Sequence, residues 1–491
     1  MKLRELLEGV QVKENRADLD AEVASITADS RLVVPGALFV AIPGFKTDGA
    51  KFIDAAISKG AVAIVGESNA ASVQVDDARA ALALIAANFY DRPADKLSLA
   101  GVTGTSGKTT TTKMIESIFD AGSEPVGLIG TIEYRAGDER LMADRTTPDA
   151  VVLQQWFAKM VDAGVRHAVM EVSSHALALK RTFGIHFAAA VFTNLSQDHF
   201  DFHKDFEDYF AAKRILFDQI DRSRKTAIVN IDDEYGRRLA NELGDCVVTF
   251  GRGANADIHP LEGFEISVRG LNGRVATPAG EVRVESKLLG APNLYNWLGA
   301  IGAAQSVGID IATIEAGIRN LTAVRGRFEY VESEGGPTVI VDYAHKPDAL
   351  EKLLQAVRDL AAGRRIVLIV GCGGDRDQGK RPKMGAIAAR LADFTVLTSD
   401  NPRGEDPEAI LDGIERGMQG ASNYARIADR RDAISRTIAE ASDEDVIVIA
   451  GKGHEPYQVI GDQILHFDDR EEAERALETR SKKTTSKSVS N

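Results

Sequence analysis

The stretch Leu97-Ser98-Leu99-Ala100-Gly101-Val102-Thr103-Gly104-Thr105-Ser106-Gly107-Lys108-Thr109-Thr110 decides the fold of the middle of this chain. Residues 97–102 predict a strand, and the segment from about Thr111 to Phe119 predicts a helix. A glycine-rich turn between a strand and a helix lets backbone N–H groups surround a phosphate at the helix N-terminus. We therefore predict a nucleotide-binding loop of an α/β domain.

Within this loop, Lys108 is expected to reach the β- and γ-phosphates of ATP, and the Thr109 hydroxyl to ligate Mg²⁺. The strict motif has glycine at the position of Val102, so the loop is a variant, and an ordinary glycine-rich turn is the alternative. The loop does not separate a kinase, a motor and a ligase. The predicted ATP-binding residues of the loop are Gly104, Thr105, Ser106, Gly107, Lys108, Thr109 and Thr110.

Strand and helix patterns alternate along the whole chain, which predicts an α/β protein with largely parallel sheets. A Pro- and Asp-containing linker at 91–95 ends the first region, and the pattern restarts near 325–327. The chain has 491 residues, a length that is consistent with about three domains. We predict domains at 1–95, 96–325 and 326–480, the central one a P-loop ATPase domain, and a disordered tail at 481–491, where acids are absent.

The composition excludes several classes of protein. With 59 Lys plus Arg against 73 Asp plus Glu, the net charge of −14 does not suit a protein that coats nucleic acid or an anionic membrane. Two cysteines, Cys246 and Cys372, are expected to be reduced thiols. The charged N-terminus lacks the apolar run of a signal peptide, and no apolar stretch reaches the roughly 20 residues of a membrane span. We expect a cytoplasmic protein.

Polar side chains follow two further predicted strands, at the sheet edge where ligands bind in open α/β folds. Strand 168–170 runs into Glu171-Val172-Ser173-Ser174-His175, and strand 188–192 runs into a segment that contains Asp198 and His199. An acid beside a phosphate loop can hold Mg²⁺, so Glu171 and His199 are candidate ligands, although any single histidine is also consistent with a structural role. Lys213, on a predicted amphipathic helix, reads by itself as a surface lysine.

The segments 103–109, 171–175 and 193–199 resemble the Mur ligases, the ATP-dependent amide-forming enzymes of peptidoglycan synthesis. The resemblance implies a UDP-sugar-binding domain at 1–95, an ATP-binding ligase domain at 96–325 and a Rossmann-like amino-acid domain at 326–480. The motifs are similar to those of the branch that joins meso-2,6-diaminopimelate to the D-Glu γ-carboxylate of UDP-N-acetylmuramoyl-L-alanyl-D-glutamate. That reaction passes through an acyl phosphate.

The resemblance also implies site residues. Segments 27–31 and 44–49 resemble uridine-nucleotide loops, and 145–148 resembles a Thr-Thr-Pro substrate loop. The residues implied to bind the UDP-muramoyl dipeptide are Ala28, Ser30, Thr146, Thr147, Ser173 and Arg181. Further ATP contacts are implied for Asn296, Arg327 and Asp342.

Lys213 falls where the family carries a lysine carboxylated by CO₂, and a carbamate can ligate Mg²⁺ through oxygen where a lysine cation cannot. The implied catalytic set is Lys108, Glu171, His199 and Lys213. One or two Mg²⁺ ions would be held by Thr109, Glu171, His199 and the carbamate of Lys213.

Asp400-Asn401-Pro402-Arg403 resembles the tetrad of diaminopimelate-adding members, with an ordinary Asn-Pro turn as the alternative. Diaminopimelate has a distal carboxylate that lysine lacks, and a guanidinium binds a carboxylate with two parallel hydrogen bonds. Arg403 would supply that fork, and Glu455 would pair with the distal ammonium. The implied amino-acid contacts are Arg376, Asp400, Asn401, Pro402, Arg403, Gly451 and Glu455.

Other readings remain open at this point. A folylpolyglutamate synthetase or a D-alanyl-D-alanine-adding ligase would share the architecture, and an ATP-gated scaffold would share the phosphate loop. The expected partners are small molecules only, namely ATP, the UDP-muramoyl dipeptide and diaminopimelate. We expect a monomer that binds no nucleic acid and does not insert into a membrane.

Overall fold

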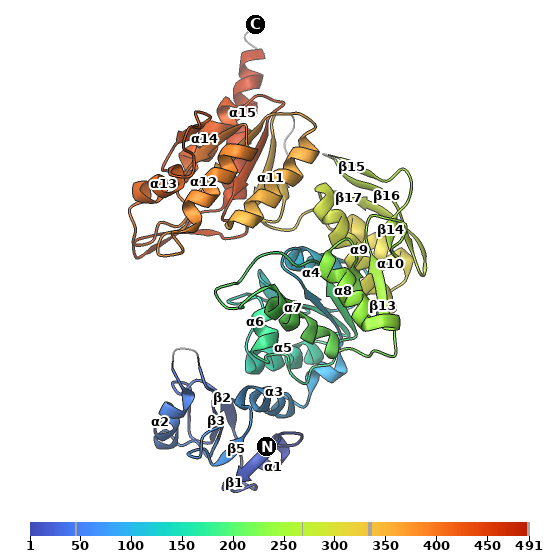
Figure 1. Cartoon of the computed structure of the whole chain (residues 1–491), viewed down its shortest axis with the longest axis vertical. Coiled ribbons are helices and arrows are strands. Elements are labelled where there is room, and N and C mark those ends of the chain that lie inside the picture. Colours follow the sequence, from blue (N-terminus) through green and yellow to red (C-terminus); the bar gives the residue numbers. More distant parts are fainter. Residues whose placement is uncertain (45–46, 268, 332–335, 489–491) are drawn as a thin grey trace. The chain divides into compact units, whose positions relative to one another are not determined.

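The computed structural model describes residues 1–44, 47–267, 269–331 and 336–488 (Figure 1). It divides into two compact units, which are described separately. The first comprises residues 1–260, 275–282 and 295–318, and the second comprises 261–274, 283–294 and the chain from 319 onward. Within the described residues, every helix is too short or too polar to span a bilayer.

The N-terminal part of the first unit has a five-stranded sheet in the order β1-β5-β4-β3-β2, parallel except for the β1–β5 pair. Strand β3 is buried along its whole length, and α3 begins where the Asp77 carboxylate accepts hydrogen bonds from the N–H groups of Arg79 and Ala80. The elements are α1 (Leu3–Leu6), β1 (Val12–Asn15), β2 (Ser25–Thr27), β3 (Ala37–Ala41), η1 (Gly49–Phe52), α2 (Ile53–Ser58), β4 (Ala63–Gly66), β5 (Val73–Val75), α3 (Ala78–Phe89) and η2 (Pro93–Lys96).

The central sheet of the first unit has the order β13-β12-β11-β6-β10-β7-β8-β9, and only β8 and β9 run antiparallel to their neighbours. Strand β6, which leads into the glycine-rich loop, lies between β10 and β11. Its strands are β6 (Ser98–Thr103), β7 (Val126–Ile129), β8 (Glu133–Ala136), β9 (Glu139–Met142), β10 (His167–Glu171), β11 (Ala189–Phe192), β12 (Ala227–Asn230) and β13 (Val247–Phe250). The helices are α4 (Lys108–Asp120), α5 (Ala150–Asp162), α6 (Ser174–Ala178), α7 (Phe206–Arg214), η3 (Ile215–Asp218), α8 (Glu234–Leu243) and η4 (Gly244–Cys246).

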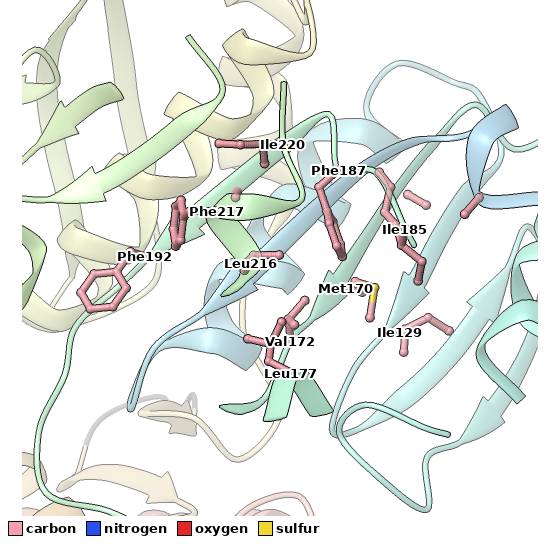
Figure 2. Packing of buried hydrophobic residues seen from close by; sticks show 14 of the residues in the cluster. Ile129, Met170, Val172, Leu177, Ile185, Phe187, Phe192, Leu216, Phe217 and Ile220 are labelled. Atoms are coloured by element: carbon pink, nitrogen blue, oxygen red, sulfur yellow. The ribbon is translucent and has the colours of Figure 1, made fainter. Parts of the chain in front are cut away.

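An apolar core packs against one face of this sheet, with residues from α5, α7 and η3 (Figure 2). The fully buried rings of Phe192 and Phe217 pack edge to face with centroids 6.4 Å apart. Gly101 lets Phe187 approach β6 closely, because a Cβ at Gly101 would lie 2.8 Å from the Phe187 ring. This packing fixes the position of η3 and, through it, of α7, the helix that carries Lys213.

A small antiparallel sheet follows, in which β16 pairs with β14, β15 and β17. These strands are β14 (His259–Pro260), β15 (Glu265–Ser267), β16 (Gly270–Thr277) and β17 (Gly280–Ser286), and the next helices are α9 (Gly290–Ser306) and α10 (Ile311–Asn320).

The second unit contains a six-stranded sheet in the order β18-β19-β23-β20-β21-β22, antiparallel only between β18 and β19. Alternate residues of β19, β20 and β23 enter two cores, one beneath α11, α12 and α13 and the other beneath α14 and α15. The elements are β18 (Glu329–Val331), β19 (Thr338–Asp342), α11 (Pro347–Ala361), β20 (Ile366–Val370), α12 (Lys380–Leu391), β21 (Phe394–Leu397), α13 (Pro407–Glu415), β22 (Tyr424–Arg426), α14 (Arg430–Glu440), β23 (Val446–Ala450), β24 (Tyr457–Ile460), β25 (Gln463–His466) and α15 (Asp469–Ser488).

The C-terminal tail differs from the prediction of disorder over 481–491. Helix α15 continues to Ser488, and 489–491 lie outside the described residues. Acids occupy the first turn of this helix, where they complement the helix dipole.

Candidate functional site

The glycine-rich loop forms the strand-to-helix turn that was predicted to hold a phosphate. Helix α4 begins at Lys108, three residues before the predicted start, directly after Gly107 at φ 86°. Gly104 has φ 145°, and a Cβ there would lie 1.9 Å from Thr193 Oγ1. A Cβ at Gly107 would lie 2.5 Å from Asn296 Oδ1. Both positions therefore require glycine. The predicted loop residue Thr110 is buried in the first turn of α4.

The residues after β11 hold the loop in place. Thr193 Oγ1 donates to Ser106 O at 2.6 Å, and Ser106 N donates to Asn194 Oδ1 at 3.0 Å. Thr105 N donates to the Asn194 carbonyl at 2.9 Å. Lys108 Nζ donates to the carbonyls of residues 104 and 105, at 2.8 and 3.0 Å. The loop is thus held in place by long-range contacts as well as by its glycines.

Glu171, at the end of β10, joins the phosphate loop to the predicted substrate loop. Its buried carboxylate accepts hydrogen bonds from Thr109 Oγ1 at 2.9 Å and from Thr131 N at 2.7 Å. The Glu171 carbonyl accepts a bond from Thr147 Oγ1 at 2.8 Å. One residue therefore links the candidate metal-binding hydroxyl of Thr109 to the Thr-Thr-Pro segment.

The predicted dipeptide-binding residues of the first unit lie close to one another. Ser173 N donates to Thr147 Oγ1 at 3.1 Å, and Arg181 donates to the Thr147 carbonyl at 2.6 Å. The hydroxyls of Thr131 and Thr146 lie 3.0 Å apart. Four of the predicted contacts thus form one cluster beside Glu171.

Lys213 is buried, so the interpretation of an isolated surface lysine is wrong. Its side chain is 1% exposed because α7 turns Tyr209 and Lys213, one helical turn apart, toward the protein interior. Lys213 Nζ donates to Gly104 O at 2.8 Å and lies 4.2 Å from the Tyr209 ring centroid. Burial lowers the pKa of Lys213 well below its usual value, and the nearby charge of Lys108 lowers it further.

His175, His199 and His203 form an aromatic cluster in the segments that follow β10 and β11. His199 has φ 57°, its ring centroid lies 4.7 Å from that of His175, and its Nε2 lies 3.3 Å from Asp198 Oδ2. His203 Nε2 lies 3.0 Å from Ser174 Oγ. Burial lowers the pKa of His175 and of His203, which favours their neutral forms. Among the described residues, no three His, Cys, Asp or Glu side chains are grouped to hold a metal ion.

The remaining predicted residues of the first unit lie in two places. Asn296 Oδ1 accepts a hydrogen bond from Thr111 Oγ1 at 3.3 Å, beside the phosphate loop. In the N-terminal part, the carbonyl of Ser30, two residues after Ala28, accepts a hydrogen bond from Lys59 Nζ at 2.8 Å. An ion pair with Arg31 lowers the pKa of Asp29 to about 2. Phe45 and Lys46 of the predicted loop 44–49 lie outside the described residues.

In the second unit, the predicted amino-acid tetrad follows β21. Asn401 Nδ2 donates to Glu455 Oε2 at 3.0 Å, and a Cβ at Gly451 would lie 3.1 Å from Asp400 Oδ2. The tetrad and the segment around Gly451 and Glu455 therefore meet, although about fifty residues separate them in the sequence.

Arg403 is held by the β24–β25 hairpin. Its backbone has φ 52°, its N–H donates to Val459 O at 3.0 Å, and its carbonyl accepts from Gly461 N at 2.8 Å. The guanidinium donates to the Gly374 carbonyl at 2.9 Å, and a Cβ at Gly374 would lie 1.9 Å from the Pro402 carbonyl oxygen. The glycine-rich segment that precedes Arg376 thus makes close contact with the tetrad.

The two nucleotide contacts predicted from the C-terminal region also belong to the second unit. The Arg327 guanidinium lies 4.8 Å from the Tyr343 ring centroid. The Asp342 carboxylate accepts hydrogen bonds from Phe328 N at 2.7 Å and from Ala344 N at 2.8 Å, and burial raises its pKa. These bonds fix the loop after β19.

Several residues that shape the site were not predicted from the sequence. Asn194 lies at a strand end that was recognised, so its position was a usable signal. Thr105 Oγ1 donates a hydrogen bond to the Tyr209 hydroxyl at 3.2 Å. The buried cations Arg430 and Lys452 lie beside the tetrad. No local pattern distinguishes these three residues from ordinary helix and loop residues.

Three family models match the chain. The Mur ligase family catalytic-domain model matches residues 22–90, the Mur ligase middle-domain model matches 102–304, and the Mur ligase glutamate ligase domain model matches 326–453. The three matches cover most of the chain in the order that the resemblance implied.

Individual relatives of this chain are also Mur ligases. The UDP-N-acetylmuramoyl-L-alanyl-D-glutamate--2,6-diaminopimelate ligase of Gloeobacter violaceus is 47% identical over 488 residues, which cover 98% of this chain and 99% of the relative. A solved structure of a ligase with the same name is 30% identical, with a TM-score of 0.71 over 98% of this chain and 99% of that chain. A MurF ligase from Thermotoga maritima shares the fold at 17% identity, with a TM-score of 0.57 over 94% of this chain and 99% of that chain. The predicted fold class, three-domain α/β with mostly parallel sheets, is confirmed.

Proposed function

This chain belongs to the Mur ligase family, and from that premise we propose that it joins meso-2,6-diaminopimelate to the D-Glu γ-carboxylate of UDP-N-acetylmuramoyl-L-alanyl-D-glutamate at the expense of ATP. The γ-phosphoryl group of ATP passes to the carboxylate and gives an acyl phosphate. The amine of diaminopimelate then attacks the acyl carbon, phosphate leaves, and an amide bond remains. The reaction belongs to peptidoglycan precursor synthesis.

The contact between the phosphate loop and the substrate loop through Glu171 carries this proposal. Thr109 bonds to the Glu171 carboxylate, and Thr147 bonds to its carbonyl. A group transferred from a nucleotide at residues 104–110 would therefore have only a short distance to travel to an acceptor held by Thr146, Thr147, Ser173 and Arg181. Such positioning, together with charge stabilisation by Lys108, is the main requirement of phosphoryl transfer.

The donor atoms around Glu171 fit magnesium. Mg²⁺ prefers oxygen ligands, and the Thr109 hydroxyl and the Glu171 carboxylate provide two of them within one hydrogen-bonded pair. We assign Thr109, Glu171, His199 and carboxylated Lys213 as the residues that hold one or two ions. When bound, magnesium offsets negative charge on the transferred phosphoryl group.

The environment of Lys213 fits carboxylation by CO₂. Its lowered pKa favours the neutral amine, which is the form that attacks the carbon of CO₂. The nitrogen loses a proton in that step, so the product is an anionic carbamate. Burial beside Gly104 would then place carbamate oxygens next to the phosphate loop.

We assign the domains by the chemistry of their residues. Residues 1–95 bind the UDP-sugar through Ala28 and Ser30, and 96–325 bind ATP and carry catalysis. Residues 326–480 deliver diaminopimelate through Arg376, Gly451, Glu455 and the tetrad 400–403, and supply Arg327 and Asp342 to the nucleotide. The two cysteines are free and buried, which is consistent with a reducing cytoplasm, and we propose a monomer.

The proposal is tested by incubating the purified protein with ATP, Mg²⁺, the UDP-muramoyl dipeptide and either diaminopimelate or lysine. We expect mass spectrometry to detect the UDP-muramoyl tripeptide with diaminopimelate, and we expect phosphate release to require all substrates. Equal use of lysine would refute the assigned amino acid. Sustained release of ADP without the amine, with a stable phosphorylated product, would identify a kinase instead.

A further inference from the structure

Lys452 is a buried cation at the centre of the second unit's acidic cluster. Its side chain is 0% exposed, and it follows Gly451 directly after β23. Its Nζ lies 3.3 Å from Asn401 Oδ1, 3.6 Å from Glu455 Oε2 and 3.9 Å from Asp400 Oδ1. Three residues assigned above to the amino acid thus surround one lysine, which has no assigned role.

The contacts of Lys452 fix the orientation of the Asn401 amide. Asn401 Oδ1 accepts from Lys452 Nζ and also from Val459 N at 2.9 Å, so the oxygen must point toward these donors. The amide nitrogen then points the other way and donates to Glu455 Oε2. Glu455 Oε1 remains directed toward the Tyr343 hydroxyl at 3.4 Å. Lys452 therefore controls the geometry of Asn401 and Glu455 together.

The charge of Lys452 matters as much as its hydrogen bonds. Asp400 and Glu455 are 10% and 20% exposed at their side chains, so little water is available to separate their negative charges. A buried carboxylate is costly unless a cation or several donors accompany it. Removing the ammonium would leave the cluster more negative by one charge.

We propose that Lys452 is a positioning residue that sets the preference of this site for an amino acid with a distal carboxylate. The inference rests on the function proposed above and deepens it. Diaminopimelate and lysine both have two amino groups, but diaminopimelate has one more carboxylate. A pocket that is more negative by one charge repels diaminopimelate more strongly than lysine, because only diaminopimelate brings the additional anion.

The test compares wild type with Lys452→Gln and Lys452→Arg, using kcat/KM for diaminopimelate and for lysine with ATP and the dipeptide saturating. Glutamine keeps a donor for Asn401 and removes the charge, so we expect the ratio of the two kcat/KM values to fall about tenfold. Arginine keeps the charge, so its ratio should remain within about threefold of wild type. The KM for ATP should change in neither variant. The control is Lys383→Gln, which removes an exposed lysine from α12 of the same unit and should leave every constant unchanged.

An equal loss with both amino acids in Lys452→Gln would overturn the proposal, because it would indicate loosening of the loop without electrostatic selection. If Lys452→Gln does not fold, as judged by circular dichroism, a large ratio change in Lys452→Arg would overturn the proposal equally well. Wild-type protein that makes no amide with diaminopimelate would instead refute the proposed function, so the two failures are distinguishable.

Discussion

Replacing Arg403 by alanine should selectively weaken the use of diaminopimelate. The Arg403 backbone is anchored on both sides by Val459 and Gly461, and its φ of 52° is equally unfavourable for alanine, so the substitution should leave the loop in place. The change therefore removes mainly the guanidinium. A hydrogen bond to a charged group contributes about 1.5–3 kcal/mol, which corresponds to about a 10- to 150-fold loss of kcat/KM for diaminopimelate.

The assay measures phosphate release and amide formation while diaminopimelate or lysine is varied. Lysine has no distal carboxylate, so its kcat/KM should be unchanged in Arg403→Ala. Arg403→Lys keeps the charge but loses the two-pronged geometry, and it should recover only part of the activity with diaminopimelate. An unchanged KM for diaminopimelate would refute the role of the guanidinium. An equal loss with lysine would indicate that the substitution disturbs the loop as a whole.

Substitutions at three further positions test other parts of the protein. Lys213→Ala should lower turnover about 100-fold, with partial rescue by acetate as a substitute carboxylate. In CO₂-free buffer, Lys213→Met should raise the melting temperature at pH 7. This gain should become smaller as the pH rises to about 10.4, the usual pKa of lysine. The reason is that the unfolded lysine binds more protons than the buried one, whose pKa is lowered. Gly104→Ala should raise the KM for ATP, because its Cβ would overlap Thr193 Oγ1 at 1.9 Å. Asp469→Asn should destabilise the protein by about 3–5 kcal/mol in chemical denaturation, because it leaves the buried Arg430 guanidinium without its carboxylate at 2.7 Å.

Matched controls isolate each effect. Gly164→Ala also places alanine at a positive φ, 75°, but its Cβ meets no atom within 4 Å, so it should leave the ATP KM unchanged. Asp443→Asn removes the exposed partner of Arg480 and should change stability by at most about 1 kcal/mol. Lys213→Ala with full activity would contradict the carbamate assignment, and a stability loss no larger in Asp469→Asn than in Asp443→Asn would contradict the importance of the buried pair.

Local sequence was sufficient to predict the parts of the site that local geometry specifies. The glycines, lysine and threonine of 104–109 lie between a strand and a helix, and their spacing alone predicts a phosphate loop at the carboxyl edge of a sheet. The same reasoning predicted Glu171 and His199 as candidate ligands, since each follows a predicted strand. The start of α4 was predicted too late, because Lys108, Thr109 and Thr110 are helical residues that read as loop residues.

Contacts between distant segments could not be predicted from local sequence. Glu171 binds Thr109 and Thr147 across 62 and 24 residues, and the sequence contains no pattern that pairs them. Asn401 and Lys452, 51 residues apart, meet only because β21 and β23 end at the same edge of their sheet.

The sequence by itself determined which segments form strands, turns and helices and where a phosphate loop is expected, because backbone preferences and short-range spacing decide these features. Its motifs also resemble those of the family to which the chain belongs. Only the tertiary structure decided which charged side chains lose their water. Lys213 and Lys452 look like ordinary surface lysines in the sequence, yet packing against Tyr209 and the Gly104 carbonyl in one case, and against Asn401 and Glu455 in the other, buries both. Burial is a property of neighbours brought from elsewhere in the chain, and the roles proposed for these two amines depend on it.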